Sequence, residues 1–341
     1  MNRRFDRYVR QMIYPGIGQE GQEKLLSSAV AIIGCGATGS VMANNLTRAG
    51  VKRIKIADRD YIELNNLQRQ ILFDEQDIER GLPKAVAAAE KLRAINSDVE
   101  IEALVTDVNA GNVEGIIEDV DLVLDGTDNF ETRYLINDAC VKLAIPWIYC
   151  GVIASYGMTM NILPGQTPCL RCLFTEAPAP GTLPTCDTAG VLNSVVGAVA
   201  SIASAEAFKL LLKRGRLNSG LIYVDLWENS FEVFDIQRRE EGCLVCGQGR
   251  YEYLTAAVGT RTTAICGRDA VQVTLGTGQK LSFPELAAKL EGVGEVSYNQ
   301  FMLRFKIDGY ELTVFPDARA IIKGTVDEGV AKSLYAKYVG T

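Results

Sequence analysis

The stretch of sequence that decides the fold is Ala29-Val30-Ala31-Ile32-Ile33-Gly34-Cys35-Gly36-Ala37-Thr38-Gly39. Its aliphatic half is typical of a buried strand, and its glycines are typical of a phosphate-binding turn that leads into a helix. We expect Gly34 to make the tight turn, Gly36 to let phosphates approach the backbone and Gly39 to let the helix pack closely on the strand. The helix N-terminus, from Ala37 on, then offers free N–H groups to anionic oxygens.

A second apolar run, Ile54-Lys55-Ile56-Ala57, ends on Asp58. This spacing after a glycine turn is expected for a carboxylate that holds a ribose hydroxyl. The glycine pattern alone is a weak signal, but together with Asp58 it predicts a nucleotide site. These two features by themselves also permit an NAD-dependent oxidoreductase.

A polar cluster directly after this carboxylate departs from the simple dinucleotide-binding pattern. The amides of Asn65, Asn66, Gln68 and Gln70, together with Arg69, can clamp phosphate oxygens, with the arginine supplying a charged fork. The alternative is a solvated loop. Further on, Lys84 follows a proline at a predicted helix start, where its charge can reach a phosphate.

Two more strands are predicted, at residues 99–105 and 120–125, and the second closes on Gly126-Thr127-Asp128-Asn129. In doubly wound sheets, ligands collect at the carboxyl ends of the strands, so Asp128 is expected to face the same crevice as Gly36 and Asp58. A carboxylate there can hold Mg²⁺ against the phosphates of a nucleotide.

Two Cys-x-x-Cys pairs predict a metal centre. Cys169 and Cys172 form the first pair, Cys243 and Cys246 the second, and four such thiolates suit a tetrahedral structural Zn²⁺ site. A redox Cys-x-x-Cys is the alternative. Between the pairs, Cys186 lies in a segment rich in Pro, Gly and Ala, a setting that allows a nucleophile. The cysteines in apolar segments, which are Cys35, Cys140, Cys150 and Cys266, are expected in the core.

The composition of the chain excludes several classes of function. The chain has 341 residues, 48% of them hydrophobic, and a net charge of −7, which argues against a general nucleic-acid partner. It contains no histidine, so a Ser-His-Asp triad and a His-paired cysteine are excluded. The N-terminus lacks the apolar core of a signal peptide, and no uninterrupted apolar run has the length that spans a bilayer. We therefore expect a cytoplasmic protein with no membrane contact, whose nine cysteines form no disulfide frame.

At this point the residues resemble a known family, the ThiF/MoeB adenylyltransferases, which are relatives of ubiquitin-activating enzymes. The resemblance covers roughly residues 5 to 250. It rests on these motifs: Arg7-Tyr8-Val9-Arg10-Gln11, Gly34-Cys35-Gly36-Ala37-Thr38-Gly39, Asp58-Arg59-Asp60, Asn66-Leu67-Gln68-Arg69-Gln70, Lys84 and Thr127-Asp128-Asn129.

The resemblance implies an activity and a set of roles. In that family, ATP adenylates the C-terminal glycine carboxylate of a ubiquitin-like sulfur carrier, which gives an acyl-adenylate and pyrophosphate. It implies that Asp58 holds the ribose, that Arg69 and Lys84 hold the phosphates, that Asp128 binds Mg²⁺, and that Arg10 reaches the ATP of the neighbouring subunit in a homodimer. The implied nucleotide-binding set is Gly34, Gly36, Ala37, Gly39, Asp58, Asn65, Asn66, Gln70 and Asn129.

The resemblance also bears on sulfur transfer. Cys186 matches the family cysteine that in ThiF-type enzymes can link covalently to the carrier. In MoeB-type enzymes that cysteine is dispensable, and a separate sulfurtransferase receives the adenylate. The carrier would end in Gly-Gly and be ThiS-like or MoaD-like, for thiamine, molybdopterin or a related sulfur pathway. A third hypothesis is a scaffold that binds the carrier without catalysis.

Two domains are predicted. Residues 1–250 are expected to form a doubly wound, mainly parallel α/β sheet, extended by antiparallel strands after residue 156. Residues 251–341 read strand, helix, three strands, helix, which predicts a small α+β domain of unknown role. It lacks the glycine-rich loop of a rhodanese domain. We lean to the ThiF-type reaction because similar tails occur on bacterial ThiF-like proteins.

Overall fold

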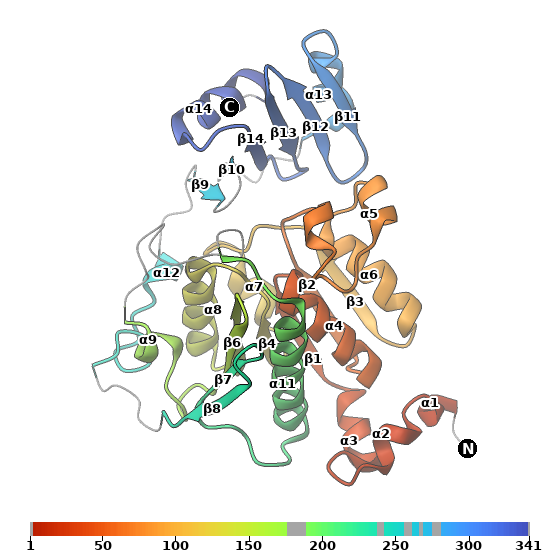
Figure 1. Cartoon of the computed structure of the whole chain (residues 1–341), viewed down its shortest axis with the longest axis vertical. Coiled ribbons are helices and arrows are strands. Elements are labelled where there is room, and N and C mark those ends of the chain that lie inside the picture. The colour runs from red at the N-terminus through yellow and green to blue at the C-terminus, as the bar shows by residue number, and fades with distance from the viewer. Residues whose placement is uncertain are drawn as a thin grey trace. The chain divides into compact units, whose positions relative to one another are not determined.

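The computed structural model describes residues 3–175, 189–236, 242–255, 261–265, 269–274 and 281–339. These residues divide into two compact units (Figure 1). Residues 3–175, 191–236 and 242–255 belong to the first unit, and residues 189–190 and those from 261 on belong to the second. Each unit has its own sheet.

An eight-stranded sheet forms the centre of the first unit. In spatial order its strands are β3 (Glu100–Leu104), β2 (Arg53–Ala57), β1 (Ala29–Ile33), β4 (Leu122–Asp125), β5 (Trp147–Ile153), β6 (Tyr156–Ile162), β7 (Leu221–Asp225) and β8 (Ser230–Phe234). β3 to β5 run parallel, while β6, β7 and β8 pair antiparallel. The predicted parallel sheet with an antiparallel extension is therefore confirmed.

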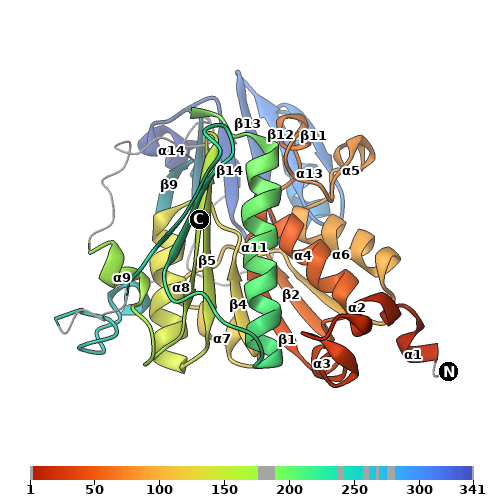
Figure 2. The ribbon, with the colours of Figure 1, turned by 60° about the horizontal axis from the view of Figure 1, so that its bottom comes forward.

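Helices cover both faces of this sheet (Figure 2). One face carries α4 (Ala37–Ala49), α6 (Lys84–Ile95) and α11 (Asn193–Leu212), which pack side by side. The other carries α7 (Val113–Ile117) and α8 (Phe130–Leu143). The order β3-β2-β1-β4-β5 produces this division, because the crossovers on either side of β1 must lie on opposite faces.

The core beneath α7 and α8 is built from residues of the central strands and of α8 itself. It includes the buried side chains of Ile33, Val123, Trp147, Tyr134 and Ile136. Because Ile33 and Val123 belong to central parallel strands, both faces of which are covered, these strands are aliphatic except for Asp125 at the end of β4.

Three helices, α1 (Arg3–Asp6), α2 (Val9–Ile13) and α3 (Gly18–Leu25), precede the first strand. Pro15 and Gly16 lie between α2 and α3. Gln11 and Gln22 each donate a hydrogen bond to the Ala49 carbonyl at the C-terminal end of α4. The short helices η1 (Leu64–Asn66), α5 (Glu75–Glu79), α9 (Leu170–Leu173) and α12 (Glu252–Thr255) lie between the larger elements.

One helix differs from the expectation about membranes. By length and composition alone, α11 is apolar enough to cross a bilayer, with 20 residues and a mean hydropathy of 1.7 in its most apolar window. Half of that window is buried inside the protein. Val195, Val199 and Ala203 are fully buried, and α11 packs on α4, β5 and β6. The helix is thus part of the core of the first unit, and Ser201, Ser204 and Glu206 interrupt its aliphatic residues, so that they form no unbroken apolar run.

The second unit is an antiparallel sheet with two helices. Its strand order is β11 (Glu295–Tyr298), β12 (Leu303–Ile307), β13 (Tyr310–Val314), β14 (Ala320–Lys323), β10 (Ala270–Thr274) and β9 (Arg261–Ile265). The helices are α13 (Phe283–Leu290) and α14 (Glu328–Tyr338). The α+β prediction is confirmed, but it omitted β9 and β11, which are short and polar.

Candidate functional site

The glycine turn lies between β1 and α4 and packs directly on the loop after β4. Gly34 has a φ of +87°, and a Cβ placed on it would lie 2.6 Å from the Gly126 carbonyl oxygen. A Cβ on Gly39 would lie 2.0 Å from the Gly34 carbonyl oxygen, and one on Gly126 would lie 2.2 Å from that same atom. Only glycine fits at these three positions. At Gly36 the nearest atom would be 3.7 Å away, which leaves room for a ligand.

Asp58, at the end of β2, is held beside this turn. It is only 8% exposed, and its carboxylate accepts hydrogen bonds from the Cys35 N–H at 2.6 Å and the Asp60 N–H at 2.7 Å. Burial raises the pKa of Asp58, and the nearby charge of Lys84 opposes that rise. Because each carboxylate oxygen has two lone pairs, Asp58 can still accept a bond from a ribose hydroxyl.

Lys84 begins α6, as predicted, and lies in the same crevice. Its side chain is nearly buried, and its Nζ forms an ion pair with Asp60 Oδ2 at 3.1 Å. Arg59 lies on the other side of Asp60 and pairs with Asp107 at 2.8 Å. Cations and carboxylates therefore alternate along the carboxyl ends of β2 and β3, an arrangement that can hold a charged ligand.

The amides after Asp58 divide into two kinds. Asn66 is fully buried, and its Oδ1 accepts from the Glu63 N–H at 3.2 Å, so it fixes the η1 turn. Asn65 is exposed, and its backbone carbonyl oxygen accepts a hydrogen bond from Arg69 Nη1 at 2.7 Å. Gln70 is 4% exposed, and its Oε1 has no hydrogen-bond partner among the described residues. Its Nε2 faces Gly36 at the 3.7 Å distance given above. Gln70 therefore has a buried amide available to a ligand at the turn.

The loop after β4 brings Asp128 to the same edge of the sheet, since Gly126 contacts Gly34 and Gly39. Asp128 is exposed. Asn129 is the N-cap of α8, and its Oδ1 accepts from the Thr132 N–H at 2.9 Å. The structure therefore gives Asn129 a capping role in addition to the nucleotide role implied by the resemblance.

Sequence reasoning missed a buried ion pair below this loop. Asp125 is fully buried, and its Oδ2 accepts from Arg133 Nε at 3.0 Å. Burial raises the pKa of Asp125, and the Arg133 charge opposes the rise. The available signal was a carboxylate at the end of an aliphatic strand, followed eight residues later by an arginine.

Arg10 is not brought to this site within the chain. It is exposed on α2, and its neighbour Gln11 contacts Ala49, the last residue of α4. The glycine turn lies at the other end of α4, whose 13 residues span about 20 Å at ~1.5 Å per residue. Cys186, the predicted nucleophile, lies outside the described residues.

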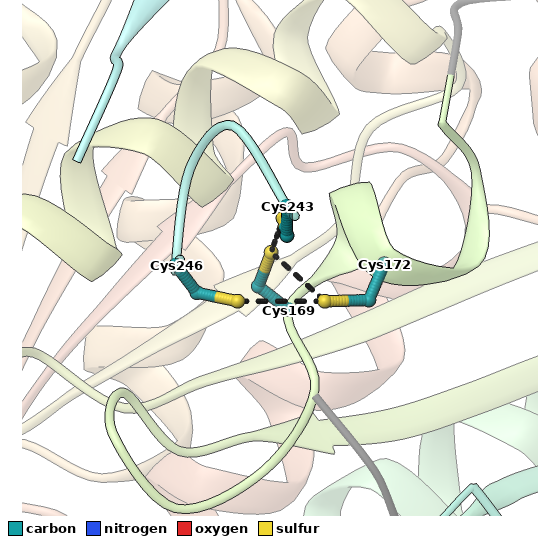
Figure 3. A group of neighbouring side chains, drawn as sticks. All are labelled: Cys169, Cys172, Cys243 and Cys246. Atoms are coloured by element: carbon teal, nitrogen blue, oxygen red, sulfur yellow. Dashed lines mark hydrogen bonds between the residues drawn. The ribbon is translucent and has the colours of Figure 1, made fainter. Parts of the chain in front are cut away.

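The four predicted metal ligands do converge (Figure 3). The Sγ atoms of Cys169, Cys172, Cys243 and Cys246 all lie within 4.8 Å of one another. Neighbouring pairs are 3.4 to 3.9 Å apart. A tetrahedral Zn²⁺ with bonds of about 2.3 Å requires sulfurs roughly 3.8 Å apart, so the group could bind a metal such as zinc. All seven cysteines that the structure describes are free of disulfides.

The chain is similar to known proteins in sequence and in structure. The sequence matches the ThiF family over residues 8–245. It is 41% identical, over 98% of this chain and 99% of the relative, to the sulfur carrier protein ThiS adenylyltransferase of Bacillus subtilis. It is 40% identical to the SAMP-activating enzyme E1 of Haloferax volcanii, over 72% of this chain and 89% of that protein.

A solved structure shares the fold. It is that of E. coli MccB with ATP, which is 24% identical and has a TM-score of 0.63 over 71% of this chain and 75% of that one. At this identity the likeness concerns the fold alone. The family match spans well over half of the residues, and the 41% identity extends across nearly the whole of both sequences. The chain belongs to the ThiF family.

Proposed function

We propose that this chain is an ATP-dependent adenylyltransferase acting on a ubiquitin-like sulfur carrier. The carrier's C-terminal glycine carboxylate attacks the α-phosphorus of ATP, the bond to the β-phosphate oxygen breaks, and pyrophosphate leaves. The products are an acyl-adenylate and pyrophosphate. The observation that carries this proposal is the match, over nearly the full length of both chains, to a protein named as a ThiS adenylyltransferase.

The residues of the crevice suit this chemistry. Nucleotidyl transfer needs neutralisation of charge and in-line placement more than a protein base, so the absence of histidine is no obstacle. In our proposal, Asp58 holds the ribose, while Arg69 and Lys84 neutralise the phosphates. Gln70 contributes its buried amide to the same ligand.

Asp128 would hold Mg²⁺, which supplies charge neutralisation at the phosphates when bound. Two features favour this assignment. Its carboxylate is exposed at the carboxyl edge of the sheet, and the Gly126 contacts tie its loop to the phosphate-binding turn. The four-cysteine group would hold Zn²⁺ in a structural role, since four protein ligands leave no open position.

We further propose a homodimer in which Arg10 serves the partner's site. Arg10 is exposed and lies one helix length away from its own glycine turn, so it is available to another subunit. The apolar side chains of Val9, Ile13 and Tyr14 on and beside α2 are exposed as well, which suits an interface. Several small or apolar residues of α11 are only half-buried within the chain.

Our proposed carrier is ThiS-like, and the pathway is that of thiamine, with a MoaD-like carrier as the alternative. The second unit favours this choice, because the similarity to the B. subtilis protein extends through it. We assign residues 1–250 to adenylation and leave residues 251–341 without a role. Cys186 as a nucleophile in later sulfur transfer stays a prediction. We place the reaction in the cytoplasm, in keeping with the free thiols.

The decisive experiment is isotope exchange between pyrophosphate and ATP with purified carriers that end in Gly-Gly. Exchange is expected with a ThiS-like carrier and not with the same carrier lacking its last glycine. ATP binding without exchange would favour a non-catalytic scaffold. Tight NAD binding with no exchange for any carrier would overturn the proposal in favour of an oxidoreductase.

A further inference from the structure

The loop that carries Asp128 is fixed from below by two buried, charged side chains. Asp125 ends β4 and is fully buried, and Arg133, on the second turn of α8, is 7% exposed. Their ion pair at 3.0 Å crosses the start of the loop. A buried pair of this kind is a poor source of net stability, because desolvating both charges offsets much of their attraction. Its presence here calls for another explanation.

All three polar groups of Thr127 are held by this pair. Asp125 Oδ1 accepts from the Thr127 N–H at 2.8 Å and from its hydroxyl at 2.6 Å. Arg133 Nη2 donates to the Thr127 carbonyl at 2.7 Å and to the Cys150 carbonyl at 3.3 Å. The peptide group that leads into Asp128 is therefore fixed on β4, α8 and β5 at once.

The Arg133 guanidinium also lies close to two aromatic rings. It lies 5.5 Å from the ring centre of Phe130 and 5.3 Å from that of Tyr149. Phe174 braces both rings, at 5.6 Å from Phe130 in an edge-on arrangement and 6.4 Å from Tyr149. Phe174 directly follows α9, which contains the metal-ligand candidate Cys172. These contacts leave the guanidinium little freedom to turn.

We propose that Arg133 is a positioning residue for adenylation, which fixes the loop 126–129 so that Asp128 stands at the phosphates. This proposal rests on the proposed function. In this proposal Arg133 acts through Thr127, because its Nε donates to Asp125 and its Nη2 donates to the backbone carbonyls of Thr127 and Cys150. Lysine cannot replace it, since an ammonium on a flexible stem lacks the planar fork that reaches Asp125 and Thr127 together.

The test is Arg133→Lys, which keeps the buried charge. We expect its rate of pyrophosphate exchange to fall by about 10²-fold, as for a misplacement of about 1 Å at a reacting centre. The Kd for ATP, measured by calorimetry, should change by less than about 3-fold, since a ground-state contact is not lost. Amide hydrogen exchange should rise locally, in the peptide that contains residues 126–129.

A matched control is Arg319→Lys. Arg319 is likewise a buried arginine, stacked on Phe315 at 3.8 Å and paired with Asp317, but it belongs to the second unit. Arg319→Lys should alter neither the rate of pyrophosphate exchange nor the amide hydrogen exchange of residues 126–129. Phe174→Leu, which removes the edge-on contact, should reproduce the Arg133→Lys effect on those amides in weaker form.

The proposal is overturned if Arg133→Lys leaves the amides of 126–129 protected as in the wild type. It is also overturned if Arg133→Lys raises amide hydrogen exchange equally throughout the first unit while the rate of pyrophosphate exchange per folded molecule stays normal. Arg133 would then stabilise the whole unit and not position the loop. The amide measurement needs no carrier. A wild-type protein inactive with every carrier would therefore defeat the proposed function and still leave the positioning of the loop testable.

Discussion

The Nζ of Lys84 lies 3.1 Å from Oδ2 of Asp60, and the pair sits beside the buried carboxylate of Asp58. Two neighbouring carboxylates repel each other unless a cation lies near both, and Lys84 supplies that charge from the first residue of α6. The lysine is therefore held in place before any nucleotide arrives. Preorganisation of this kind is what electrostatic catalysis requires.

We expect Lys84→Met to lower the adenylation rate by about 10²-fold or more, because one preorganised contact with the phosphates is lost. Arg69→Ala and Asp128→Ala should each lower the rate by a similar factor for the same reason. Pyrophosphate exchange per mole of folded protein measures this. Lys91→Met is the matched control, because Lys91 is also on α6 and pairs with Asp74 and Asp77 away from the turn. Near-normal rates in the site variants would defeat the assignment.

An Arg10→Ala subunit mixed with an Asp128→Ala subunit should regain activity if Arg10 acts across a dimer. Each mixed dimer has one intact site, so random mixing restores roughly a quarter of the wild-type rate. Gel filtration and mass spectrometry must first establish that the mixed dimer exists. A confirmed heterodimer without rescue would mean that Arg10 works within its own chain.

Purified protein should contain one zinc per chain, and Cys246→Ser should lose it. Removing the metal with a chelator should lower the midpoint of thermal unfolding, because the site ties α9 to the segment that carries Cys243 and Cys246. Elemental analysis and calorimetry provide the readouts. Cys140→Ala is the control for metal content, since Cys140 is a buried cysteine that does not belong to the four-cysteine group. Four free thiols in metal-free native protein would refute the site.

Asp138 should make stability depend on pH. Burial raises its pKa from 3.8 to about 6, while its carboxylate accepts from the Tyr253 N–H of α12 at 3.0 Å. The folded state thus keeps a proton that the unfolded chain has lost, so this group's contribution to stability falls as pH rises from about 4 to about 6. When the pH rises from about 4.5 to about 7.5, the free energy of unfolding of the wild type should fall by about 2 kcal/mol relative to that of Asp138→Asn, as measured by denaturant titration. Equal pH profiles for both proteins would contradict this.

Local patterns were sufficient to predict much of the first unit. The aliphatic runs ending at Ile33 and Ala57, and the glycines between β1 and α4, carry their own geometry, so strand, turn and helix could be placed from the sequence. Gly50, the C-cap of α4, likewise adopts a φ of +84°, which favours glycine. Each of these features is decided by residues within one turn of the chain.

Relations between distant residues could not be predicted in this way. In the sequence, Asp125 has the pattern of a polar strand end and Arg133 that of a polar helix face. Nothing in either pattern indicates that the two side chains form a buried pair, because tertiary packing decides which residues meet. The same holds for Asp60 as partner of Lys84, and for the position of Arg10 at the far end of α4. β9 and β11 were missed because Thr262, Thr263 and Ser297 interrupt the apolar alternation that identifies a strand.

A Cβ on Gly39 and a Cβ on Gly126 would both collide with the carbonyl oxygen of Gly34, so the phosphate-binding turn and the Asp128 loop are packed around one shared atom. A methyl group on either glycine would push on that one atom. Once the first methyl has forced the two loops apart, the second finds the space already open. The free-energy cost of Gly39→Ala combined with Gly126→Ala should therefore be clearly less than the sum of the two single costs, a negative departure from additivity that denaturant unfolding of the three variants would measure.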